Sequence, residues 1–373
     1  MIGPTNDRRS ARIPRGLLGM LALVAAVEAV VGGLRHDLAS PLAEDWRIAA
    51  RAAREKAPGR DVLCFGDSLV KYGVLPRVIE ARTGLKSYNL ATSGGTMPSA
   101  YFLLRQALDA GARPKAIVAD FAALMLKDPD PPALQNYAEL ASVRDCVDLA
   151  WTSGSGDFLA ASVLSKLLPS FQWRFEIRVA VRAALDGRSA SRRAFLPIHR
   201  AQWDREAGAQ PMPPGRVRHP SEDFLIDGVS PGTWACERRN QAYLDRFLGL
   251  AGSRGIPVYW LIPPLCPEAH ARRAARGSDE AYGRFARAMI GRHRNVVVLD
   301  ARGSGYDDSV HIDHIHLDRR GASVLSGDLA AILADRLERS TIGPSWVEMP
   351  RYAGRASDGP TAALARTRAS EPR

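Results

Sequence analysis

The sequence predicts an α/β protein with a parallel sheet of about five strands, a large insertion between the third and fourth strands, and an N-terminal transmembrane helix. Short apolar runs alternate with segments of helical periodicity along much of the chain, which is typical of βαβ units and parallel sheets. The alternation stops in one long central stretch, which predicts the insertion. An uninterrupted apolar run near the N-terminus predicts the transmembrane helix.

The expected strands are apolar runs at residues 61–66, 87–91, 116–122, 255–264 and 295–301. Helices are expected at residues 45–57, 69–84, 99–111, 236–255, 279–293 and 319–339. These elements predict one domain at residues 45–343. Residues 344–373 are charged and rich in Ala, Arg and Ser, a composition that predicts a disordered tail.

The insertion covers about residues 128–235 and contains Pro-rich patches. It also contains four tryptophans, Trp151, Trp173, Trp203 and Trp234. We expect these side chains to pack the insertion against the sheet, the alternative being that they line a substrate groove.

Composition limits the classes of function. The chain has 373 residues, of which 46% are hydrophobic and 24% charged, as in folded globular proteins. The formal net charge of +11 would suit an anionic partner, but the basic residues are spread along the chain without a nucleic-acid-binding motif. We therefore expect no nucleic-acid partner. Cys64, Cys146, Cys236 and Cys266 form no C-x-x-C pair, so no zinc or redox motif is expected; a disulfide between Cys146 and Cys236 stays open.

The apolar run at residues 16–34 is long enough, at about 1.5 Å per residue, to cross a hydrocarbon core of about 30 Å. The arginines that precede it are Arg8, Arg9, Arg12 and Arg15. The positive-inside rule then places residues 1–15 in the cytoplasm and everything after the run outside. We expect a single-pass signal anchor in the cytoplasmic membrane, with a periplasmic domain.

Two other interpretations of the run remain. A cleaved signal peptide would use Val-Glu-Ala at residues 27–29, which is a poor cleavage site inside a run that continues beyond it. A buried amphipathic helix of a soluble protein conflicts with the apolar character on all sides. Glu28 lies within the span, and we expect it to face a partner helix or to lie near the outer interface.

A serine stands at the end of the first predicted strand, in Gly66-Asp67-Ser68-Leu69. Open α/β sheets bind ligands at the carboxyl ends of their strands, and a helix N-terminus there offers free N–H groups to an oxyanion. The simpler interpretation is an ordinary N-cap serine. We expect Asp67 to hydrogen-bond backbone near this serine.

Near the end of the chain, Asp313 and His316 lie three residues apart before the last predicted helix. A serine after the first strand with this Asp-x-x-His pair resembles the SGNH/GDSL hydrolases over about residues 60–125 and 236–340. The resemblance implies a flavodoxin-like three-layer α/β/α sandwich. It also implies that Ser68 is the nucleophile, His316 the general base, and Asp313 the group that orients His316.

The segment from Asn89 to Gly95 resembles the second block of this family, whose glycine N–H contributes to the oxyanion hole. Gly94 matches best, and Gly95 is one residue away. The resemblance therefore implies an oxyanion hole formed by the N–H groups of Ser68 and Gly94. A plain turn glycine is the alternative.

The third block of the family, Gly-x-Asn-Asp, is missing, and the third strand ends with Asp120. An ionised carboxylate cannot donate a hydrogen bond. The oxyanion hole is therefore smaller or is completed by a residue of the insertion, and loss of one donor costs about 10²–10³ in rate in a protease. The altered block is similar to that of exported enzymes such as alginate O-acetyltransferases.

A metal site is the main rival interpretation of the segment that contains His311, Asp313, His314 and His316. Imidazole and carboxylate groups suit zinc or iron. Neighbouring side chains in a loop, such as Asp313 and His314, rarely converge on one ion, however, and a metal would leave Ser68 unexplained. We expect no metal and no cofactor, and we expect His311 and His314 to be exposed loop residues.

The sequence thus predicts a serine esterase that acts outside the cytoplasmic membrane on an acylated small molecule or glycan. Two alternatives remain. The same triad would serve an O-acyltransferase that modifies an exported polysaccharide, and the missing block would suit a membrane-anchored binding or scaffold protein with a degenerate site.

Overall fold

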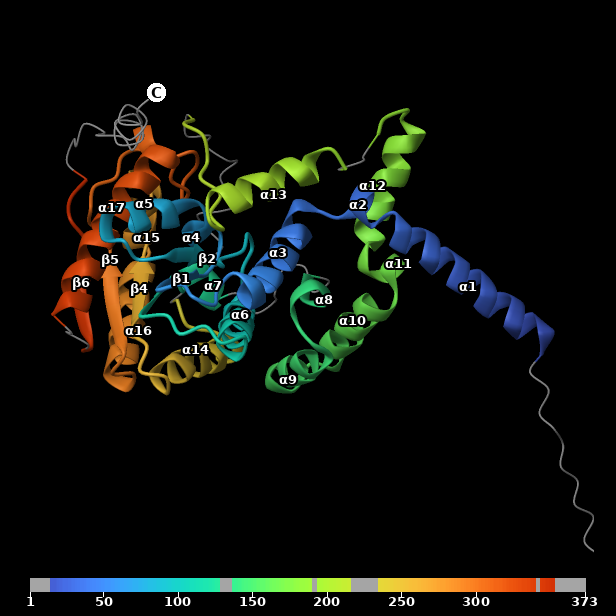
Figure 1. Cartoon of the computed structure of the whole chain (residues 1–373), viewed down its shortest axis with the longest axis horizontal. Coiled ribbons are helices and arrows are strands. Elements are labelled where there is room, and N and C mark those ends of the chain that lie inside the picture. The colour runs from blue at the N-terminus through green and yellow to red at the C-terminus, as the bar shows by residue number, and fades with distance from the viewer. Residues whose placement is uncertain (1–13, 128–135, 190–192, 216–233, 340–342, 353–373) are drawn as a thin grey trace, which may run out of the picture.

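The computed structural model of the protein describes residues 14–127, 136–189, 193–215, 234–339 and 343–352 (Figure 1). Arg8, Arg9 and Arg12, on which the expected membrane orientation depends, lie outside the described residues. Residues 353–373 of the tail also lie outside them.

The predicted α/β class and the parallel sheet are confirmed. Six strands are arranged in the order β2-β1-β3-β4-β5-β6, and every neighbouring pair is parallel. The strands are β1 (Val62–Phe65), β2 (Ser87–Asn89), β3 (Ala116–Ala119), β4 (Val258–Ile262), β5 (Val296–Asp300) and β6 (Ser345–Glu348).

The sixth strand corrects two expectations, the count of about five strands and the disordered tail from residue 344. β6 pairs with β5 in the register Ser345↔Val297 to Glu348↔Asp300. The backbone N–H of Met349 then donates to the Asp300 carbonyl (2.8 Å), and the Met349 side chain is buried. The first part of the tail therefore closes one edge of the sheet.

Helices cover both faces of the sheet, because successive strand residues point to opposite sides. Leu63 and Phe65 of β1 belong to one apolar cluster, whereas Val62 and Cys64 belong to a second. The helices on the first side are α3 (Pro41–Glu55), α6 (Met97–Asp109), α14 (Arg238–Gly252) and α16 (Ser278–Arg292). Those on the second side are α4 (Ser68–Gly73), α5 (Pro76–Thr83) and α17 (Arg319–Glu338).

The single helix expected at residues 69–84 is two helices, α4 and α5. Pro76 occupies the first turn of α5, where its missing N–H costs nothing. Residues before a proline avoid the helical region, and Leu75 is accordingly extended.

Most of the described part of the insertion between β3 and β4 is helical. Its helices are α7 (Ala123–Lys127), α8 (Tyr137–Leu140), α9 (Val143–Ser153), α10 (Gly156–Leu167), α11 (Pro169–Gln172), α12 (Arg174–Leu185) and α13 (Phe195–Arg205). Trp173, Trp203 and Trp234 are buried, as the packing interpretation predicts, but Trp151 is 87% exposed. The remaining short elements are α2 (Arg35–Leu38), α15 (Pro267–Ala275) and the 3-10 turn η2 (Asp308–Val310).

The apolar N-terminal run forms α1 (Arg15–Gly33), which is long and apolar enough to cross a membrane. Every residue of α1 is exposed or half-buried, so the interpretation as a buried helix of a soluble protein is wrong. Glu28 accepts hydrogen bonds from the backbone N–H (2.8 Å) and the hydroxyl of Ser170 at the start of α11. The carboxylate in the span thus faces a partner helix, one of the two expected outcomes. Cys146 and Cys236 are free thiols, so the possible disulfide is not formed.

β6 generates a prediction about stability. A chain that ends at Gly343 loses the pairing with β5 and the burial of Met349, whereas a chain that ends at Tyr352 keeps both. At about 1 kcal/mol per backbone hydrogen bond, we expect the shorter chain to be less stable by about 2–4 kcal/mol. Urea unfolding in detergent, followed by circular dichroism, measures the difference. Equal unfolding midpoints for the two chains would show that β6 contributes nothing.

Candidate active site

The turn after β1 brings Ser68 to the first position of α4. Gly66 has φ of +137°, and a Cβ there would lie 1.5 Å from the Asp120 Oδ1 atom, so the turn requires glycine. The strand order reverses between β1 and β3, and the crevice at such a reversal is where open α/β sheets bind ligands.

The structure brings the three predicted side chains together. His316 Nε2 lies 2.8 Å from the Ser68 Oγ atom, and His316 Nδ1 lies 2.7 Å from Asp313 Oδ2. Side-chain exposure is 14% for His316 and 24% for Asp313, so the pair is partly screened from water but open to a ligand. Both distances are within hydrogen-bond reach, which a serine nucleophile and its base require.

The Asp313 carboxylate is fixed by its own loop. Asp313 Oδ1 accepts the backbone N–H groups of Ile315 (2.9 Å) and His316 (2.8 Å). Burial raises the pKa of Asp313, but the hydrogen bond and charge of His316 and these two N–H donors outweigh burial, so the net pKa is lowered. An ionised Asp313 accepts the proton on Nδ1, and Nε2 is then left to accept the Ser68 proton.

His311 and His314 are not exposed, contrary to expectation; their exposed fractions are 0% and 2%. His311 Nδ1 donates to the Asp307 carbonyl (2.9 Å), and His314 Nδ1 lies 3.6 Å from Cys266 Sγ. Each ring therefore packs with its own partner inside the loop that carries Asp313. In the described ranges, no group of three or more His, Cys, Asp and Glu side chains is arranged to hold a metal ion.

The loop with Gly94 packs directly against the turn before Ser68. The Thr92 N–H donates to the Gly66 carbonyl (3.2 Å), and a Cβ on Gly95 would lie 2.5 Å from that same oxygen. Gly94 has φ of +61°. Among the described residues, no protein acceptor binds the N–H of Gly94 or of Ser68, so both donors are free for a ligand oxygen.

Two residues that were not singled out from the sequence contact this loop, and one of them also contacts the histidine. Tyr72 OH lies 2.8 Å from the Ser93 Oγ atom, and the Tyr72 ring meets the His316 ring edge-on at 5.1 Å between centroids. Trp46 Nε1 donates to the Ser93 carbonyl (3.2 Å). Helix α3 and helix α4 thus hold the residue next to Gly94 from two sides.

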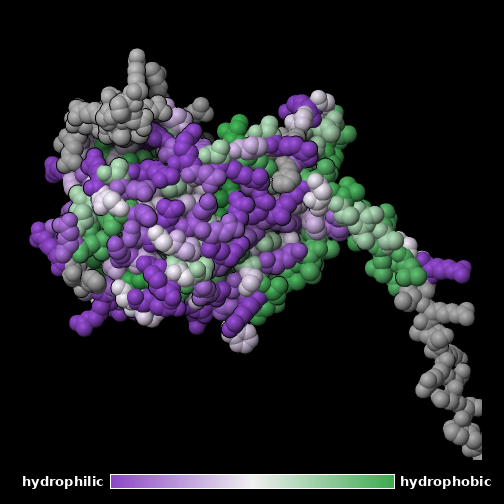
Figure 2. All heavy atoms as spheres, viewed as in Figure 1, coloured by the Kyte–Doolittle hydropathy of each residue, from purple (hydrophilic) through white to green (hydrophobic). Residues whose placement is uncertain are grey.

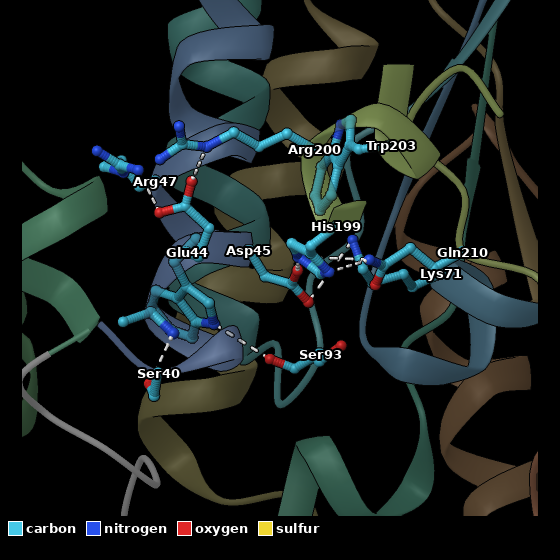
Figure 3. A network of polar contacts seen from close by, with 12 residues as sticks. Ser40, Glu44, Asp45, Arg47, Lys71, Ser93, His199, Arg200, Trp203 and Gln210 are labelled. Carbon is cyan, nitrogen blue, oxygen red and sulfur yellow. Dashed lines mark hydrogen bonds and ion pairs between the residues drawn. The ribbon is translucent and has the colours of Figure 1, made fainter. Parts of the chain in front are cut away.

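A buried polar network lies behind Ser93 (Figure 3). His199 Nε2 donates to Asp45 Oδ1 (2.6 Å), and Gln210 Nε2 donates to His199 Nδ1 (2.7 Å). Lys71 Nζ lies 3.6 Å from Asp45 Oδ2 and 3.1 Å from the centre of the Trp203 ring. This network joins α3 to α4 and to α13 of the insertion.

Burial in this network changes the acidity of Lys71. Burial lowers the pKa of Lys71 to about 8, although the nearby Asp45 charge opposes the shift. Burial raises the pKa of Asp45, but Lys71 and His199 outweigh it and the net pKa is lowered. The two charges therefore stabilise each other, and the Trp203 ring adds a cation–π contact. No local sequence pattern around any of these residues predicts the network.

Asp120, at the position where the SGNH/GDSL resemblance implies an asparagine, is fully buried. Its Oδ1 accepts the Asp67 N–H (3.1 Å), and Asp67 Oδ1 accepts the Leu69 N–H (2.8 Å), which confirms the expected backbone bond of Asp67. Burial, the Asp67 charge and a hydrogen bond to the Asp67 carboxyl raise the pKa of Asp120 well above its ordinary value. Burial also raises the pKa of Asp67. Both carboxyl groups are therefore harder to ionise than an exposed aspartate.

No protein-family model matches the chain, and a search of curated proteins finds no match. The site is therefore interpreted from its own geometry.

The carboxyl pair generates a prediction about pH. A carboxyl group with a raised pKa holds its proton in the folded chain but not in the unfolded one, so stability falls as pH rises from about 3.9 toward the folded pKa. Asn at position 120 keeps the acceptor for Asp67 N–H and donates in place of the proton. We expect Asp120→Asn to remove this fall and to be the more stable protein above neutral pH, as measured by urea unfolding over a pH series.

Asp120→Leu is the matched control. It removes the acceptor for the Asp67 N–H, and an unsatisfied buried donor costs about 1–3 kcal/mol, so this variant should be less stable at every pH. Parallel pH profiles for the native protein and Asp120→Asn would contradict the raised pKa of Asp120.

Proposed function

We propose that the protein is a serine esterase of the SGNH/GDSL type that acts outside the cytoplasmic membrane. The observation that carries the proposal is the continuous set of hydrogen bonds from Ser68 through His316 to Asp313, at 2.8 and 2.7 Å. An N-cap serine has no need of a histidine at this distance, and a histidine oriented by an ionised carboxylate is the base that a serine nucleophile requires.

The topology supports the same proposal. Strands β2-β1-β3-β4-β5 follow the 2-1-3-4-5 order of flavodoxin-like folds, with β6 added at the edge. Helices lie on both faces, as in the three-layer α/β/α sandwich that the resemblance implies. Ser68 follows β1 at the reversal of strand order, and His316 precedes α17, which packs on α4 and α5.

The proposed reaction follows from the positions of the protons. The Ser68 Oγ atom attacks the acyl carbonyl carbon while His316 Nε2 takes the hydroxyl proton, and Asp313 stabilises the imidazolium. The N–H groups of Ser68 and Gly94 bind the oxyanion. The imidazolium then protonates the leaving alcohol, which departs and leaves an acyl ester on Ser68. Water attacks this ester, His316 takes its proton and returns it to Ser68 Oγ, and the carboxylic acid is released.

The acceptor need not be water. An O-acyltransferase would deliver the same acyl group to a sugar hydroxyl of an exported polysaccharide. Asp120 favours this second candidate, because it stands in the altered third block and its carboxyl is engaged with Asp67 rather than held as a free donor.

The first test is covalent labelling of the full chain in detergent with a fluorophosphonate. We expect Ser68→Ala to abolish labelling and Asp313→Asn to slow it by about 10²–10⁴-fold, because the imidazole loses its orientation. Ser323→Ala, on α17, is the matched control and should label like the native protein. Absence of labelling of the native protein from about pH 6 to about pH 9, where a histidine base becomes neutral, would leave the binding or scaffold role.

The same preparation separates hydrolase from transferase. Incubation with p-nitrophenyl acetate, with and without oligosaccharides, is followed by mass spectrometry of the sugars. Acetate release alone identifies an esterase, whereas acetylated sugar that disappears in Ser68→Ala identifies a transferase.

We further propose that α1 is a single-pass anchor with the domain on the periplasmic side, supported by its length and apolar character. Alkaline phosphatase fused after residue 373 should be active, since that enzyme needs the oxidising compartment, and green fluorescent protein fused there should be dark when exported through the Sec pathway. The reverse pair of results would place the domain in the cytoplasm.

A further inference from the structure

The exposed large apolar side chains are concentrated in one part of the molecule. Outside α1 and Leu34, the exposed large hydrophobic residues of the described ranges are Leu124 and a set between residues 143 and 198. Figure 2 shows hydrophobic residues on α1 and on the helices beside it, whereas the surface over the sheet is mainly hydrophilic. A surface that faces water carries exposed large apolar residues singly. This concentration therefore indicates a surface that contacts something apolar.

Helices α9 to α12, residues 143–185, carry most of this surface; we call them the insertion platform. On α9 the exposed large apolar residues are Val143, Val147 and Trp151, four positions apart and therefore on one side of the helix. On α10 Leu167 is 69% exposed, and on α12 Leu185 is 83% exposed. The exposed apolar residues of α12 are Phe175, Val179, Val181 and Leu185.

The insertion platform is fixed to the outer end of the proposed anchor. Ser170, at the start of α11, holds Glu28 of α1 through two hydrogen bonds. Trp173 packs with Leu38 and Ala39, and Ile177 of α12 packs against the same cluster as Val31 of α1. Figure 1 shows α10 and α12 running crosswise to α1 where α11 meets it. If α1 crosses the membrane as proposed, helices that run crosswise to its outer end lie along the bilayer surface.

The polar residues of the insertion platform suit a lipid headgroup layer. α12 carries Arg174, Arg178 and Arg182 among its exposed apolar residues. Arginines on an apolar helix bury their stems and keep their charges at the headgroups, and anionic lipids attract such charges. An exposed tryptophan such as Trp151 prefers the membrane interface.

We propose that the insertion platform lies in the outer leaflet of the membrane that α1 crosses, with the exposed faces of α9 and α12 in the headgroup and upper acyl region. The proposal rests on the membrane anchor of the proposed function and does not depend on the triad. Lipid explains why the exposed large apolar side chains are concentrated on these helices and why the exposed set continues from α1.

Depth-dependent fluorescence of the full chain in phosphatidylcholine–phosphatidylglycerol nanodiscs tests the proposal. An environment-sensitive label is attached to Trp151→Cys or Leu185→Cys in a Cys236→Ser background, because the other native cysteines are buried. Leu23→Cys on α1 reports on the anchor, and Ala331→Cys on the exposed side of α17 reports on water. Quenching by doxyl-labelled lipid is compared with quenching by aqueous iodide.

We expect the labels at positions 151 and 185 to be quenched several-fold more by lipid than by iodide, like the label at position 23, and the label at 331 to show the reverse. If position 23 is quenched by lipid but 151 and 185 by iodide, the insertion platform lies in water and the proposal is wrong. If 151 and 185 are shielded from both quenchers, another protein covers them, which also overturns it. If the label at position 23 is quenched by iodide, α1 does not lie in the membrane, and both the proposed anchor and this proposal are wrong.

Discussion

All six strands run parallel, and the positions of the functional groups depend on this constraint. Parallel strands end at the same edge of a sheet, so the turn after β1 and the segment after β5 meet there. That edge brings Ser68 to His316 across 248 positions of sequence. It also brings Asp120, at the end of β3, against the backbone of Asp67. An antiparallel strand at any of these places would have sent one partner to the opposite edge.

Local pattern was enough to predict the parts of the site that lie on regular elements. Ser68 follows an apolar strand, and Asp313 and His316 precede a helix, so their order along the chain determined where they would meet. The strand β6 was missed because it has four residues and lies only half-buried at the edge, in a segment of charged composition. His311 and His314 were predicted to be exposed because the segment is polar, yet the Asp307 carbonyl and Cys266 lie beside their rings and allow them to be buried.

The network of Asp45, Lys71, His199 and Gln210 was beyond prediction for a different reason. Each residue type is normally a surface residue, and burial of any one alone would cost several kcal/mol. Only the three-dimensional contact of α3, α4 and α13 makes burial of the group tolerable, since Asp45 and the Trp203 ring offset the cost of the ammonium. The network thereby connects the insertion with α4, the helix that begins with Ser68. Neither the pattern nor the composition of the two segments predicts this contact.

The path from α1 to the site contains almost no irregular chain. Only Leu34, Ala39 and Ser40 lie between the helices α1, α2 and α3, and α3 carries Trp46, which donates to Ser93 in the loop beside Gly94. A flexible linker would let the domain take many orientations and many distances from the end of α1. Here successive helices set the distance between the end of α1 and Ser68. If α1 crosses a membrane as proposed, this connection would hold Ser68 at one distance from the membrane surface. Ligands held at that distance from the membrane would then meet a high local concentration of the site, and ligands farther away would meet almost none.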